Sequence, residues 1–92
     1  MINNKKIELV QSIQALSLEI TNESDIDIFY DYSSHVKVFI IKIILNGWNN
    51  ESYETDLYKT VYLDWNCEKE LYEILEFLKT IKGELKDEIN SI

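Results

Sequence analysis

The chain has 92 residues, of which 46% are hydrophobic, and its formal net charge is −8. This length fits one domain, residues 1–92, and this composition excludes a disordered chain. Because all the cations are lysines and they are outnumbered by carboxylates, the charge disfavours direct binding to nucleic acid or to an anionic membrane and favours a basic protein partner.

The cellular compartment follows from the cysteine count and the chain start. A single cysteine, Cys67, excludes an internal disulfide, and the opening MINNKKIELV has polar residues where a signal peptide places its apolar core. The longest apolar run, VFIIKIIL at 38–45, is far too short to cross a membrane. The sequence therefore predicts a protein of the cytoplasm, or of the host cytoplasm if a phage encodes it.

The first predicted element is an amphipathic helix over residues 3–20. Its apolar residues recur at steps of three and four, the spacing of one helix face. They are Leu9, Ile13, Leu16 and Ile20, with Ile2, Ile7 and Val10 widening the stripe. Asn3 and Asn4 are candidates to cap the start of the helix, and residues 21–23 are expected to end it.

Three strands are expected next. Residues 25–32 alternate, which predicts one face with Ile26, Ile28, Tyr30 and Tyr32 and another with Asp25, Asp27, Phe29 and Asp31. A short turn at 33–35 leads into a second strand over 35–45, apolar on both faces, and this hairpin predicts antiparallel pairing. Residues 57–65 form the third strand, with Leu57, Lys59, Val61, Leu63 and Trp65 on one face and Tyr58, Thr60, Tyr62 and Asp64 on the other.

A second amphipathic helix is predicted after Asn66, a good N-cap, with Glu68 and Glu70 in its first turn. Its apolar stripe is Leu71, Ile74, Leu75, Phe77, Leu78, Ile81, Leu85 and Ile89. Gly83 costs about 1 kcal/mol inside a helix and leaves open whether the helix continues past it. The order α-β-β-β-α predicts an α+β fold with two helices packed on one face of a three-stranded antiparallel sheet.

This packing leaves the second face of the sheet without a helix. If the helices cover Ile28 and Val61, the open face carries Asp25, Asp27, Phe29, Asp31, Tyr58, Tyr62 and Asp64. The second strand adds either Val36, Val38, Ile40 and Ile44 or Phe39, Ile41 and Ile43. A contiguous exposed patch of rings and aliphatic side chains typically marks an interface. Its occupant is a foreign protein or a second copy, and a second copy needs lysines such as Lys42 between the carboxylates.

Residues 46–56, NGWNNESYETD, interrupt the apolar strands and are expected at one end of the sheet. Trp48 and Tyr53 are large rings in a polar segment, and Glu51, Glu54 and Asp56 add carboxylates. Either Trp48 folds back onto the core, or the loop carries binding residues, as surface loops often do. The second interpretation extends the binding surface by these five residues.

Patterns typical of catalysis and of metal binding are missing. The one histidine, His35, falls in a turn and Cys67 at a helix start, so nothing brings a nucleophile and a base together. Structural zinc needs four Cys or His ligands, the aspartates of 25–31 lack the glycine and closing glutamate of a calcium loop, and no glycine run could hold a phosphate. The sequence predicts no enzyme, no cofactor and no metal site.

The polar loop also resembles an acidic NGWN stretch of small phage-encoded anti-CRISPR proteins that inhibit Cas9. The matching residues are Asn46, Gly47, Trp48, Asn49, Glu51, Tyr53 and Glu54. The resemblance implies a three-stranded antiparallel sheet with helices, a net negative charge, and action as a DNA mimic at the site that reads the duplex beside the target. The element order differs, because NGWN here leaves a strand and there joins helices.

The leading hypothesis is a non-enzymatic inhibitor or adaptor that binds a basic protein surface, in the specific form of a phage anti-defence protein that mimics nucleic-acid charge. A second hypothesis is an immunity protein or antitoxin that blocks a cognate toxin. A third is a homo-oligomeric structural or regulatory domain, in which the apolar face pairs with itself. Binding that weakens steeply with salt is expected only of a partner held by charge.

Overall fold

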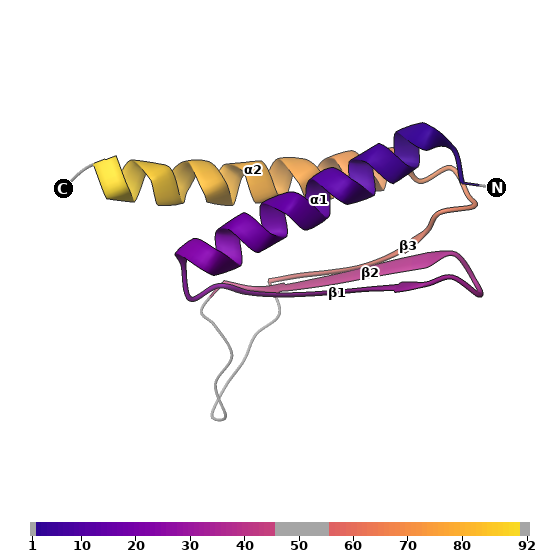
Figure 1. The fold of residues 1–92 in the computed structure, drawn as a ribbon, viewed down its shortest axis with the longest axis horizontal. Helices are drawn as coiled ribbons and strands as arrows, with labels where there is room; N and C mark the ends of the chain where they lie inside the picture. Colours follow the sequence, from indigo (N-terminus) through magenta and orange to yellow (C-terminus); the bar gives the residue numbers. More distant parts are fainter. Residues whose placement is uncertain (1, 46–55, 91–92) are drawn as a thin grey trace, which may run out of the picture.

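The computed structural model describes residues 2–45 and 56–90, and in this part of the chain two helices lie on one side of a three-stranded sheet (Figure 1). The elements follow in the order α1 (Asn4–Glu23), β1 (Asp27–Ser33), β2 (Val38–Ile44), β3 (Leu57–Tyr62) and α2 (Glu68–Asn90). The strand order is β1-β2-β3, and both pairs are antiparallel. The predicted α+β fold with the order α-β-β-β-α is confirmed.

Helix α1 begins where an asparagine caps it, as expected. Oδ1 of Asn3 accepts a hydrogen bond of 2.9 Å from the backbone N–H of Lys6, which would otherwise have no partner within the helix. The helix runs on to Glu23, past its predicted end at residue 20. Within this extension the hydroxyl of Thr21 donates to the carbonyl of Ser17 at 2.9 Å, so it does not cap a helix end.

The buried face of α1 differs from the predicted stripe in two polar members. The buried apolar residues are, as expected, Leu9, Ile13 and Ile20. Lys6 and Ser17 are buried with them at helical spacing, while Ile7 is 43% exposed. The Ser17 hydroxyl donates to the carbonyl of Ile13 at 2.7 Å, so its burial leaves no unpaired polar atom.

Lys6 ties the start of α1 to the segment between β3 and α2. Its Nζ donates to the carbonyl oxygens of Leu63, at 2.8 Å, and Trp65, at 2.7 Å, and the residue is only 9% exposed. An ammonium group tolerates so little water because the two carbonyls replace its hydration. These bonds therefore fix α1 against the end of the sheet.

The strands are shorter than predicted or shifted along the sequence. β1 starts at Asp27, β2 starts at Val38, and β3 ends at Tyr62 instead of residue 65. Residues 34–37 form the turn between β1 and β2, where Lys37 takes a left-handed φ of 56° that no sequence pattern marks. The Lys37 carbonyl accepts a hydrogen bond of 2.9 Å from the N–H of Leu63, which keeps the chain beside the turn after β3 has ended.

Helix α2 begins at Glu68, one residue later than the predicted cap at Asn66 implies. The carbonyl of Cys67 accepts a hydrogen bond of 3.1 Å from the N–H of Leu71. The helix is continuous past Gly83 to Asn90, which settles the question that the glycine raised.

The core lies between the helices and one face of the sheet. Both faces of β2 are largely apolar in sequence, and the odd-numbered positions Phe39, Ile41 and Ile43 belong to this core, whereas Val38 and Ile44 are buried outside it. Around them, β3, the segment after it and α2 contribute Val61, Leu63, Cys67, Leu71, Ile74, Leu75, Leu78 and Ile81. The even-numbered positions of β2 therefore point to the opposite face of the sheet.

Candidate functional site

The open face of the sheet is the side that points away from both helices (Figure 1). The register places Asp27, Phe29 and Asp31 of β1 and Tyr58, Thr60 and Tyr62 of β3 on this side, flanking Val38, Ile40, Lys42 and Ile44 of β2. Successive rows across the strands are Asp27–Ile44, Phe29–Lys42–Tyr58 and Asp31–Ile40–Thr60. The alternation in the sequence thus assigned the faces of β1 and β3 as the structure has them, and the structure chose between the two alternatives for β2.

Aromatic side chains dominate the exposed area of this face. Phe29 is 47% exposed, Tyr58 60% and Tyr62 45%. Such exposure is high for rings, which proteins usually bury. A shallow hollow of about 190 Å³ is lined by Phe29, Tyr58, Ile40, Lys42, Asp31 and Tyr30. A hollow of this size can receive one side chain of a partner.

Trp65 corrects the sequence-based assignment. It was predicted to share the covered face with Val61, but β3 ends at Tyr62, so the alternation no longer applies three residues later. The indole instead stacks on the Tyr62 ring, with centroids 4.8 Å apart and planes at 21°, and it is 67% exposed. This tryptophan is a member of the candidate surface that the sequence missed, and only the end of the strand could have revealed it.

Carboxylates lie along the margins of the face. Asp31 Oδ1 accepts a 2.9 Å hydrogen bond from the backbone N–H of Tyr32. Asp56 Oδ2 accepts one of 2.7 Å from the N–H of Leu45, at the base of the segment that joins β2 to β3. Both side chains stay exposed. The hydrogen bond holds each carboxylate in place, and its exposure leaves the negative charge accessible to a partner.

Asp25 and Asp64 were predicted on the open face as strand residues. The structure places Asp25 before the start of β1 and Asp64 in the turn after β3, and both are exposed. Strand alternation therefore does not assign either residue to the open face.

Lys42 occupies the middle of the open face. Its Nζ lies 5.3 Å from the centroid of the Phe29 ring, a cation–π contact. Lys59 pairs with Ile41 and so belongs to the covered side. Because a positive charge stands at the centre, cations of a partner are expected at the margins that carry Asp27, Asp31 and Asp56.

Four predicted site residues, Trp48, Glu51, Tyr53 and Glu54, lie outside the described residues, and so does the NGWN stretch. The structure therefore places eight of the predicted site residues. They are Asp27, Phe29, Asp31, Tyr58 and Tyr62 on the open face, and Asp25, Asp56 and Asp64 in the segments that flank its strands.

Reactive groups in the described part of the chain are dispersed. Cys67 is buried in the core, and its burial raises the pKa of the thiol, against a smaller opposing effect of Lys6. His35 is exposed in the turn before β2. Within residues 2–45 and 56–90, no three His, Cys, Asp or Glu side chains gather to hold a metal ion.

No protein-family model, no curated protein and no solved structure matches the chain. Neither helix of the described ranges combines the length and apolar character needed to cross a membrane.

Proposed function

We propose that this chain is a non-enzymatic inhibitor or adaptor that binds a basic protein surface through the open face of its sheet. The observation that carries the proposal is the set of exposed rings on that face, above all Tyr58 and the stacked pair of Tyr62 and Trp65. Rings of this kind anchor protein interfaces, because they bury much area at little cost in conformational entropy.

Charge defines the class of partner. The whole chain carries a net charge of −8, and Asp27, Asp31 and Asp56 stand at the margins of the face. An acidic surface speeds the approach of a basic partner and discriminates against an acidic one. Exposed rings also accept the guanidinium groups of arginines by stacking. Rings at the centre and carboxylates at the rim together fit a basic protein.

The resemblance of residues 46–54 to anti-CRISPR proteins gives the proposal a specific form. In that form the partner is a nucleic-acid-binding nuclease such as Cas9, and the acidic surface occupies a site that otherwise binds DNA. A direct test is therefore whether the chain inhibits DNA cleavage by Cas9. Inhibition that is lost when salt is raised would support charge mimicry, and absence of inhibition removes this form while leaving the broader proposal to the experiment below.

The broader experiment is capture of partners by the tagged chain from a bacterial lysate at low and high salt. Trp65→Ala and Tyr58→Ala should each reduce the captured amount about tenfold or more. Leu18→Ala is the matched control, because Leu18 is 62% exposed but lies on α1, away from the sheet face. Equal capture by all three variants, or capture that salt leaves unchanged, would contradict the proposal.

Self-pairing through the same face is the competing function, and Lys42 is the observation that favours it. A central lysine between two carboxylate margins can meet an aspartate of a second copy. Light scattering over a concentration series separates the two functions. A dimer that dissociates when Trp65 is replaced by alanine would assign the open face to self-association.

A further inference from the structure

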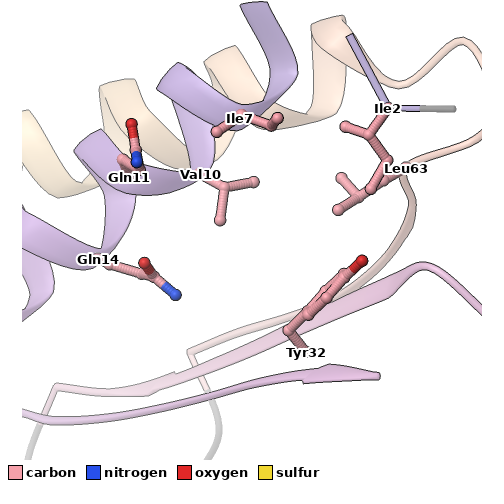
Figure 2. Close-up of a pocket in the computed structure, with 7 residues that line it drawn as sticks. All are labelled: Ile2, Ile7, Val10, Gln11, Gln14, Tyr32 and Leu63. Atoms are coloured by element: carbon pink, nitrogen blue, oxygen red, sulfur yellow. The ribbon is translucent and has the colours of Figure 1, made fainter. Parts of the chain in front are cut away.

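A second surface lies on the helix side of the sheet, between α1 and the end of β1. In Figure 1, α1 runs close to the sheet at its C-terminal end and farther from it toward its N-terminus. The wedge left between them is a groove of about 300 Å³, shown in Figure 2. Its main lining residues are Ile7, Val10 and Gln14 from α1, Tyr32 from β1 and Leu63 after β3.

The groove has an apolar interior and a polar rim. Figure 2 shows the Tyr32 ring rising from the sheet toward Leu63, with Val10 above it and the Gln14 amide at the side. Ile7 and Tyr32 are 43% and 40% exposed, and Tyr32 lies on the side of the sheet that the helices cover. Aliphatic and aromatic walls with an amide at the margin fit a short apolar side chain that enters from outside.

β1 borders this groove and is an edge strand. Tyr32 lies opposite Phe39, and its backbone N–H donates to the Asp31 carboxylate instead of to β2. The antiparallel pairing gives the same result. The N–H of Leu63 donates to the carbonyl of Lys37, so the backbone N–H and C=O groups of the odd-numbered residues of β2 point to β3. Those of the even-numbered residues of β2 point to β1 and pair with its odd-numbered residues. The backbone of Tyr32 therefore faces outward, where a further strand would pair.

We propose that the edge of β1 binds an extended segment of a partner protein in which apolar residues alternate with lysine or arginine. A strand added beside β1 directs alternate side chains to opposite faces of the sheet. Those beside Tyr30 and Tyr32 enter the groove under α1. Those beside Asp27 and Asp31 lie on the open face, next to the two carboxylates.

Charge selects this occupant over a second copy of the chain. Pairing of two β1 strands would bring Asp27 and Asp31 onto one face with their own copies, between two chains of net charge −8. A basic segment places cations there instead. The inference takes its partner class, a basic protein, from the proposed function, but it assigns recognition to different residues.

Asp31 adds selectivity at this edge. In the free protein its carboxylate accepts the hydrogen bond of the Tyr32 N–H, so this N–H is not available to an added strand. Charged side chains commonly protect exposed sheet edges in this way. A lysine or arginine that pairs with Asp31 releases that N–H for the incoming strand. Neutral or acidic segments supply no cation and are therefore expected to be rejected.

The test uses three synthetic peptides and the full chain. One peptide alternates valine and lysine, one has the same composition in two blocks, and one alternates valine and glutamate. Binding is followed by the backbone amide signals of Tyr30 and Tyr32 in NMR titrations. Binding of the alternating valine–lysine peptide about tenfold or more tighter than the block peptide, with shifts at these amides, is expected. Equal binding of these two peptides would overturn the proposal.

Two variants assign the binding to the groove. Ile7→Asp should weaken binding of the alternating valine–lysine peptide about tenfold or more, whereas Leu18→Asp, an exposed position on the same helix, should not. Circular dichroism confirms that both variants fold. Equal losses in the two variants would overturn the proposal, as would a dimer of the free chain that Ile7→Asp dissociates.

Trp65→Ala separates this inference from the proposed function. If the groove binds as proposed, this variant retains the alternating valine–lysine peptide even where it loses a protein partner at the open face. If the variant loses binding of both the peptide and the partner, both bind at the open face, and the proposal for the groove is overturned.

Discussion

The two faces of the sheet are made by the same three strands and behave in opposite ways. On the covered face, Phe39, Ile41 and Ile43 are completely buried under the helices. On the open face, Val38 and Ile44 are also buried, but Tyr58 and Phe29 keep about half of their surface in water. Burial on the first face stabilises the fold, so the second face is free to carry side chains that serve a partner. Replacing a residue on the covered face should therefore change mainly stability, and replacing its neighbour on the open face should change mainly partner binding.

The sharpest test of this comparison is two isoleucines that are neighbours in β2. Ile41→Ala should lower the free energy of unfolding by about 3–4 kcal/mol, because it removes fully buried methyl groups and leaves a cavity. Ile40→Ala, on the open face and half-buried, should cost only about 1 kcal/mol. Urea unfolding measures both. Similar losses at the two positions would mean that the open face is also covered in solution.

A smaller effect is expected at the bond between α1 and the sheet end. Lys6→Met should lower the free energy of unfolding by about 2 kcal/mol, because the carbonyls of Leu63 and Trp65 lose a charged donor. Lys5→Met is the control, since Lys5 is exposed, and should change stability by less than about 0.5 kcal/mol. If Lys6→Met is as stable as the unmodified chain, water satisfies these carbonyls and the bond is not needed.

The smallest effect is a gain, at an exposed position of α2. Gly83→Ala should raise the free energy of unfolding by about 1 kcal/mol, because alanine favours the helix. A Cβ at Gly83 would meet nothing within 4 Å, so there is no steric cost. Thermal unfolding measures the gain, and capture of a partner should be unaffected. An unchanged or lowered midpoint would contradict the continuity of α2 through this residue.

The sequence predicted the faces of the sheet best where a pattern is local. The alternation from Asp27 to Asp31 and from Tyr58 to Tyr62 placed these residues on the correct faces, since neighbours in a strand must point to opposite sides. It failed at Trp65, because the pattern continues in sequence after the strand has ended. Residues 46–55 lie outside the described residues, so the predictions made for Trp48 and Glu54 stay predictions.

The sequence by itself determined the order of helices and strands, because periods of 3.6 and 2 residues are written into short stretches of chain. Only the tertiary structure decided which side of β2 is covered, since both sides are largely apolar and Lys42 is the one polar residue that distinguishes them. It also decided that Lys6 is buried and that Ile7 lines a groove. The physical reason is that the carbonyls that satisfy Lys6, and the tilt of α1 that exposes Ile7, arise from segments far apart in the sequence.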